Sequence, residues 1–201
     1  AVMAGMYGVY HGSKGLKNIS KTIHSLTATL AQGLTQMGYQ SLNKTYFDTI
    51  KISIGNVSMD NIKTYAEDAK MNFHYIDEKT LSISIDEKDD LANINDILKV
   101  FAKSCNHSDS DNLISEVLSG DYTKAEARIP EKLYRTSIFL EHEVFNSYQS
   151  ETGMMRYIKS LENKDLSLTH SMIPLGSCTM KLNAASELFP LSWAEFSNLH
   201  P

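Results

Sequence analysis

The chain has 201 residues, of which 42% are hydrophobic, 9% aromatic and 21% charged. This composition is typical of a globular protein with enough apolar residues for a core, and it differs from that of disordered or fibrous chains. Lysine and arginine number 19 against 24 acidic residues, a formal net charge of -5, so a nucleic acid or another polyanion is disfavoured as a partner. Cys105 and Cys178 lie far apart without a CxxC motif, so neither a disulfide scaffold nor a structural zinc site is expected. No run of about eighteen apolar residues occurs, so no membrane span is predicted.

The two ends of the sequence are unusual for a complete protein. Residues 1–10 read AVMAGMYGVY, a pattern typical of a buried helix, and the chain stops at Pro201 directly after an apolar segment. We therefore expect an internal fragment of a longer protein, with low solubility by itself. Removal of an initiator methionine before Ala1 is the alternative explanation for the start.

The first periodic segment runs from Gly15 to Gly38. Its apolar residues recur every three or four positions, which predicts an amphipathic helix that Gly38 ends. Three isoleucines between positions 50 and 54 alternate with polar residues, which predicts a half-buried strand before a turn at Gly55 and Asn56.

A second helix is predicted to begin at Asp60 as its N-cap and to carry Ile62, Tyr65 and Ala66 on one face. Strands at 73–76 and 81–85 flank a polar turn and are expected to form a hairpin. A third helix covers residues 91–101, and the polar stretch 104–112 follows it. This order predicts an α/β fold in which helices cover one face of a mainly antiparallel sheet, a layout that by itself specifies no function.

The remaining sequence has weaker patterns. Residues 111–118 and 129–145 are predicted as helical pieces of a linker, in which Glu141, His142 and Glu143 form a solvated surface. Ser150 is expected to cap a helix with methionines 154 and 155 on one side. Residues 166–183 lack helical periodicity and are expected to form strand and loop.

Residues 170–183, HSMIPLGSCTMKLN, concentrate groups that can bind an anion. Gly176 lets the backbone approach a ligand closely, and hydroxyl, amide and ammonium groups can donate hydrogen bonds to it. The candidate residues are Ser177, Cys178, Thr179, Lys181 and Asn183. A carboxylate or phosphate site is one interpretation, and a surface turn whose side chains satisfy their own backbone is the other.

Several segments together resemble one protein family. They include Met6-Tyr7, Val9-Tyr10-His11-Gly12, Gly15-Leu16, Phe145-Asn146, Ser150-Glu151-Thr152, Met154-Met155-Arg156-Tyr157, residues 171–184, Trp193, Glu195-Phe196 and Leu199-His200-Pro201. On these residues the chain resembles the P-protein of the glycine cleavage system, glycine dehydrogenase (decarboxylating), strongly at both ends and weakly between about Gly38 and Asn112. It departs from the family's pattern at Gln149 and Gly153, where histidine and an acidic residue are usual.

The resemblance implies an enzyme of the aminotransferase-like fold type I that depends on pyridoxal 5'-phosphate. Such an enzyme releases CO2 from glycine and passes the aminomethyl group to the lipoyl arm of the H-protein. Its other implied partners are the remaining glycine cleavage components and a second copy in a homodimer. The implied location is cytoplasmic in a bacterium and mitochondrial in a eukaryote.

The resemblance also implies a division of the chain. Residues 1–104 would end the first of two homologous halves, residues 105–149 would form a helical linker, and residues 150–201 would form the N-terminal arm of the second, catalytic half. The cofactor lysine of the family follows a histidine, but no His-Lys dipeptide occurs here, so the chain is expected to be inactive alone. The five candidate loop residues would hold anionic groups near substrate and cofactor. A non-catalytic subunit and an amino-acid-binding regulatory module are the alternatives.

Overall fold

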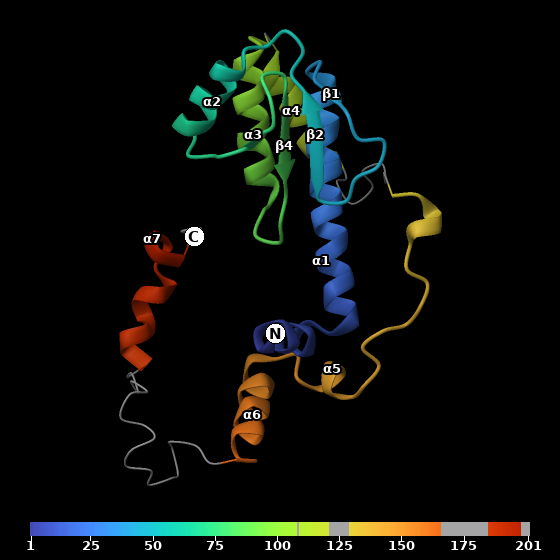
Figure 1. Cartoon of the computed structure of the whole chain (residues 1–201), viewed down its shortest axis with the longest axis vertical. Helices are drawn as coiled ribbons and strands as arrows, with labels where there is room; N and C mark the ends of the chain where they lie inside the picture. The colour runs from blue at the N-terminus through green and yellow to red at the C-terminus, as the bar shows by residue number, and fades with distance from the viewer. Residues whose placement is uncertain (108, 121–128, 166–184, 198–201) are drawn as a thin grey trace. The chain divides into compact units, whose positions relative to one another are not determined.

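The computed structural model describes residues 1–107, 109–120, 129–165 and 185–197 (Figure 1). They belong to two compact units, Ala1–Ser147 and Tyr148–Pro201. Within the described ranges, no helix is both long enough and apolar enough to cross a bilayer.

A four-stranded antiparallel sheet lies at the centre of the first unit. Its strands are β1 (Gln40–Ser41), β2 (Thr49–Ser53), β3 (His74–Tyr75) and β4 (Thr80–Ser84), in the order β1-β2-β4-β3. Strands β2 and β4 pair along their whole length, whereas β3 pairs with β4 at two positions. The predicted strand and hairpin are confirmed, and β1 is an additional strand that the sequence pattern did not indicate.

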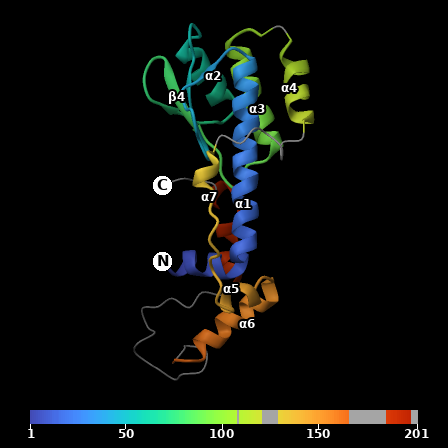
Figure 2. The same ribbon diagram turned by 90° about the vertical axis from the view of Figure 1, so that its right-hand side faces the viewer.

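Helices cover one face of this sheet, as predicted. They are α1 (Val2–Gln36), α2 (Met59–Asp68), α3 (Leu91–Ser104) and α4 (Ser110–Ser119). Figure 2 shows the sheet, then α1 and α3, and then α4 as successive layers. The opposite face of the sheet carries polar side chains, among them Thr49, Lys51 and Ser82.

The hydrophobic core lies between the sheet and its helices. Each of its principal side chains is at most 4% exposed: Leu26, Leu30, Leu34, Ile50, Ile52, Ile54, Ile62, Leu81, Ile83, Ile85, Ile94, Leu98 and Phe101. The alternating strand residues and the helical stripes therefore meet where their periodicities predict. Burial of each such side chain contributes about 1.5–3 kcal/mol.

The end of α1 depends on a glycine. Gly38 has φ +92°. The Gly38 N–H donates to the Thr35 carbonyl at 3.0 Å, and the Tyr39 N–H donates to the Leu34 carbonyl at 3.0 Å. These two bonds form a Schellman motif, with Leu34 and Tyr39 both buried in the core. The predicted stop at Gly38 is confirmed.

Two other helix starts can be compared with their predictions. Helix α2 has Ser58 as its N-cap, so the prediction of Asp60 is wrong by two residues. Asp60 lies in the first turn, where its negative charge interacts favourably with the helix dipole. Helix α3 begins with a capping box, in which the Asp90 carboxylate accepts from Asn93 N–H and the Asn93 side chain accepts from Asp90 N–H.

Residues 2–10 are helical, as their pattern predicts, and most of them are exposed in this chain. Val2 is 76% and Met3 86% exposed, whereas Gly8 and Val9 are buried. A Cβ placed on Gly8 would lie 3.7 Å from the ring of Phe145, which belongs to the short helix α5 (Val144–Ser147). This end of α1 is therefore covered on one side by α5.

The predicted helix over residues 129–145 is wrong. Only the 3₁₀ turn η2 (Glu131–Leu133) and the start of α5 are helical there. Pro130 precedes the turn, and Leu140 has φ +55°, a value incompatible with a continuous α-helix. No residue of η2 or α5 is buried, so little burial of side chains supports a longer helix there.

In the second unit the structure describes α6 (Glu151–Glu162), the 3₁₀ helix η3 (Ala185–Ser192) and α7 (Ala194–Ser197). The Ser150 hydroxyl accepts from Gly153 N–H at 3.2 Å, so the predicted cap of α6 is confirmed. A Cβ on Gly153 would lie 2.9 Å from this hydroxyl oxygen. The small residue at 153 therefore fits the cap closely.

Replacing Gly38 with alanine tests the helix stop. Because a Cβ at φ +92° is strained, we expect Gly38→Ala to lower the free energy of unfolding by about 1–2 kcal/mol. Gly5→Ala is the matched control, since no atom lies within 4 Å of the added Cβ, and its expected effect is neutral or stabilising. Urea unfolding of both variants measures the difference, and equal stability would contradict the role of Gly38.

Candidate functional site

The five residues predicted to form an anion site, Ser177, Cys178, Thr179, Lys181 and Asn183, lie outside the described residues. Their role therefore stays a prediction. In the described part, polar and ionisable groups gather at three other places: the bend in α1, a groove beside β4, and a groove at the C-terminal ends of α1 and α3.

The bend in α1 is centred on Gly12, which has φ +60° and ψ -174° and interrupts the helix. The ring of His11, directly before it, lies 4.3 Å from the ring of Tyr7 and 5.1 Å from that of Tyr10. A Cβ on Gly15 would lie 2.9 Å from the Cβ of His11. Gly12 thus permits the bend, and Gly15 makes room for the histidine beside it.

Tyr7 connects this bend to a distant loop. Its hydroxyl donates a hydrogen bond to the carboxylate of Glu87, which lies between β4 and α3. This bond stabilises the neutral phenol and raises the pKa of Tyr7, with smaller contributions from burial and from the charge of Glu87. A phenol, a carboxylate and an imidazole therefore adjoin here, but none of them lines either of the two grooves described next.

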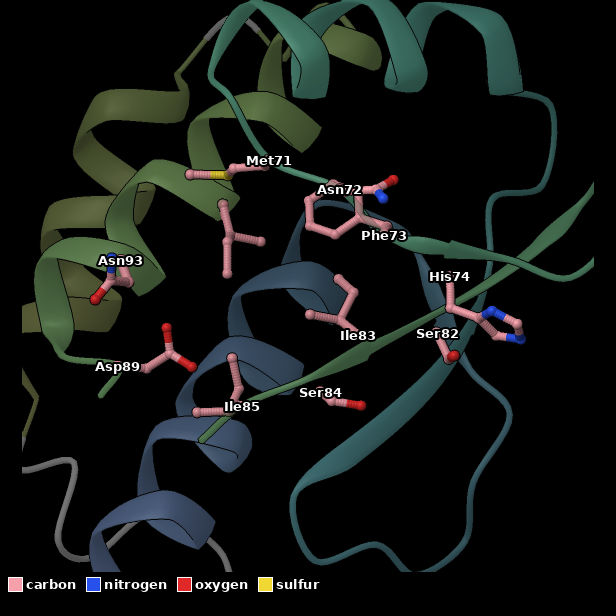
Figure 3. A pocket seen from close by; sticks show the side chains of 11 residues that line it. Met71, Asn72, Phe73, His74, Ser82, Ile83, Ser84, Ile85, Asp89 and Asn93 are labelled. Atoms are coloured by element: carbon pink, nitrogen blue, oxygen red, sulfur yellow. The ribbon is translucent and has the colours of Figure 1, made fainter. Parts of the chain in front are cut away.

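The first groove lies between β4 and the start of α3 and has a volume of about 350 Å³ (Figure 3). Phe73, Ile83, Ile85 and Ile97 supply its apolar lining. Its polar lining comes from Asn72, His74, Ser82, Ser84, Asp89 and Asn93. Asp89 is half-buried, and this desolvation raises the pKa of its carboxyl group, although the Asp86 N–H that it accepts at 2.8 Å opposes the shift.

The second groove, of about 460 Å³, includes Tyr39 and Cys105. Tyr39 is buried, and its hydroxyl donates to the carbonyl of Phe101 at 2.8 Å, while the two rings meet edge to face at 5.1 Å. Burial raises the pKa of Tyr39 far above its usual value of 10.0, and the Cys105 thiol adds to the effect. Cys105 is half-buried, and its thiol is free.

Neither groove can hold an aldehyde cofactor through a Schiff base, because no lysine lines either of them. A search of the described residues also finds no group of three histidine, cysteine or acidic side chains suited to a metal ion. Neither of these two grooves therefore contains a residue that could hold pyridoxal phosphate covalently.

Two histidines differ in whether their positions in the sequence indicate their contacts. His142 is exposed and its Nδ1 accepts from Val144 N–H at 3.2 Å, which confirms the surface predicted for residues 141–143. His24 received no role from its spacing, yet its Nδ1 lies 2.9 Å from the Phe47 carbonyl and its ring stacks on that of Phe47 at 6.0 Å. No spacing rule could find this contact, because its partners lie 23 residues apart.

The fold is thus an α/β module with helices on one face of an antiparallel sheet. A family model described as glycine cleavage system P-protein matches residues 1–101. The chain belongs to this family, and the resemblance seen in the sequence is confirmed.

Individual relatives extend the match along the whole chain. The chain is 46% identical over 201 residues to mitochondrial glycine dehydrogenase (decarboxylating) of Mus musculus, covering all of this chain and 19% of that protein. It is 47% identical over 201 residues to glycine dehydrogenase (decarboxylating) of Vibrio parahaemolyticus, again over all of this chain and 20% of that protein. The chain therefore spans about a fifth of the length of these curated relatives.

Alkaline titration tests the environment of Tyr39. Because its folded-state pKa lies above the unfolded value of 10.0, the stabilisation is intact below pH 10 and is lost as the pH rises further. One such tyrosine lowers the free energy of unfolding by up to about 1.4 kcal/mol per pH unit. Tyr39→Phe should reduce this slope between pH 10 and 11, whereas Tyr134→Phe, at an exposed position, should leave it unchanged. Equal slopes in urea titrations of the two variants would contradict the assignment.

Proposed function

We propose that this chain acts as part of a glycine-decarboxylating enzyme that releases CO2 from glycine and passes the remaining aminomethyl group to the oxidised lipoyl arm of the H-protein. The observation that carries the proposal is the identity of 46–47% to glycine dehydrogenases (decarboxylating) over the full 201 residues. That match includes the segment 171–183, which holds the densest set of anion-binding groups in the sequence.

We further propose that the longer enzyme binds pyridoxal 5'-phosphate in a fold of the aminotransferase type. Because the described grooves lack a lysine, the residue that holds the cofactor is expected elsewhere in that enzyme. In this arrangement residues 1–104 end the first half, residues 105–149 link the halves, and residues 150–201 begin the second half. A homodimer and the other glycine cleavage components complete the proposed assembly.

The proposed location follows from the class of relatives. The mouse and human relatives are described as mitochondrial, and others come from bacteria. We propose that this chain works in the mitochondrion if its source is a eukaryote and in the cytoplasm if its source is a bacterium.

A non-catalytic subunit of the same family is the second candidate, favoured by the lack of a His-Lys dipeptide in these 201 residues. Sequencing the coding region on both sides of the chain separates the two. We expect an open reading frame that continues to a His-Lys pair. A frame without that pair would support the non-catalytic subunit.

The role of the 171–183 segment can be tested in the full-length enzyme. If Thr179 and Lys181 hold anionic groups of substrate or cofactor, Thr179→Ala and Lys181→Met should each raise the KM for glycine or lower turnover by roughly ten- to a hundredfold. This factor corresponds to the loss of a hydrogen bond that involves a charged group, which is worth about 1.5–3 kcal/mol. Lys132→Met, at an exposed position outside the segment, is the control. Unchanged KM and turnover in the two loop variants would show that the loop is structural.

The departure at Gln149 can be tested in the same enzyme. If the usual histidine contributes to activity, Gln149→His should raise turnover. An unchanged rate would show that position 149 has no such role.

A further inference from the structure

On one side, strand β4 is paired with another strand along only part of its length. Its partner β2 pairs with it from Thr80 to Ser84, whereas β3 pairs with it at Leu81 and Ser82 and not beyond. The last residue of β4, Ser84, therefore lies at an open edge of the sheet, next to the groove of Figure 3.

The direction of the Ser84 backbone groups follows from the hydrogen bonds at the two ends of the β2–β4 ladder. Ile85 N–H donates to the Asp48 carbonyl at 2.9 Å, and Ile54 N–H donates to the Lys79 carbonyl at 3.0 Å. In an antiparallel ladder hydrogen-bonded and non-hydrogen-bonded pairs alternate, so Thr49 and Ser84 form a non-hydrogen-bonded pair. Their hydroxyl oxygens, 2.8 Å apart, fit the shorter separation of such a pair. The N–H and C=O of Ser84 therefore point away from β2, toward the open edge.

The groove offers two kinds of side-chain contact beside this edge. Phe73, Ile83 and Ile97 form an apolar floor on the helix-facing side of the sheet. Asp89 stands on the same side, at the start of α3, and Figure 3 shows its carboxylate directed toward the groove. Side chains two residues apart on an extended chain point to the same side. One extended segment beside β4 can therefore contact both the apolar floor and the Asp89 carboxylate.

The charge at the groove is acidic. The loop from β4 to α3 reads Asp86-Glu87-Lys88-Asp89-Asp90. The Glu87 carboxylate accepts from Tyr7, and Asp90 caps α3, so both have structural roles. Asp89 accepts the Asp86 N–H through Oδ2, and no hydrogen bond to its Oδ1 is found among the described residues. This oxygen is available to a basic partner.

We propose that this groove binds a short extended segment of a partner protein, which adds to the sheet beside Ser84, places an apolar side chain on Phe73 and Ile83, and places a basic side chain two residues away against Asp89. Addition of a strand to an open edge supplies main-chain hydrogen bonds, and the floor and the carboxylate supply specificity. A second copy of this chain fits less well, because symmetric pairing at Ser84 would bring two acidic loops together. The inference does not depend on the proposed function.

The probe is the peptide acetyl-Thr-Val-Thr-Arg-Thr-amide, titrated into the ¹⁵N-labelled full chain. We expect a saturable shift of the Ser84 amide resonance and smaller shifts at Asp89 and Asn93. A peptide N-methylated at the residue that faces Ser84 should bind at least tenfold more weakly, because it cannot donate the main-chain hydrogen bond. Replacement of its arginine by glutamate should have a similar effect.

Matched variants locate the charge contact. Asp89→Asn should weaken binding of the arginine peptide at least fivefold, whereas Glu78→Gln, an exposed acid in the β3–β4 turn, should leave it unchanged. The amide spectrum of Asp89→Asn, compared with that of the parent chain, establishes that the loop keeps its fold.

Several results would overturn the proposal. One is an unmoved Ser84 resonance at millimolar peptide, and another is equal binding of the N-methylated peptide. Free arginine that shifts Asp89 and Asn93 as strongly as the peptide does would assign the groove to a small cation instead. A concentration-dependent dimer with Ser84 at its interface would assign the edge to a second copy.

Discussion

In the register that pairs Ile50 with Ile83 and Ile52 with Leu81, the aliphatic side chains of β2 and β4 all lie on one face of the sheet. The rest of the first unit depends on this register. A slip of β2 by one residue would turn its isoleucine side chains to the open face and bury Lys51 instead. The apolar stripes of α1 and α3 have a place to pack because the register collects the four aliphatic side chains of β2 and β4 in one layer.

The packing of Phe73 explains why the sheet has an open edge and a groove beside β4. Phe73 precedes β3, is 9% exposed and packs its ring 5.5 Å from that of Phe101. The aromatic core contact therefore holds the chain at residue 73 close to α3, and β3 begins only at His74. Ser84, whose backbone points to that side, is left without a strand partner. The groove beside β4 is thus a consequence of core packing.

The sequence predicted the elements whose side chains face this core. The apolar periodicities of residues 15–38, 50–54 and 91–101 were sufficient to predict these elements, because their apolar residues are the ones that the fold buries. Strand β1 has two residues, too few for a period to be recognised. Residues 129–145 have apolar side chains, but none of these residues is buried, so helical spacing did not produce a helix. The bond from Tyr7 to Glu87 joins residues 80 apart, which no local pattern reveals. The anion-binding role predicted for residues 171–183 rests on family resemblance, since their residue types alone also fit a surface turn.

Apolar side chains are distributed unevenly along the chain. The first unit buries aliphatic residues around its sheet, but its short helices η2 and α5 contain no buried residue. Helices α6 and α7 of the second unit contain none either. Several large apolar side chains outside the core are exposed, among them Ile138 at 73%, Met155 at 63% and Trp193 at 55%. Burial of these side chains against further protein surface would stabilise the segments by about 25 cal/mol per Å². Relatives about five times as long as this chain contain the polypeptide that could supply it.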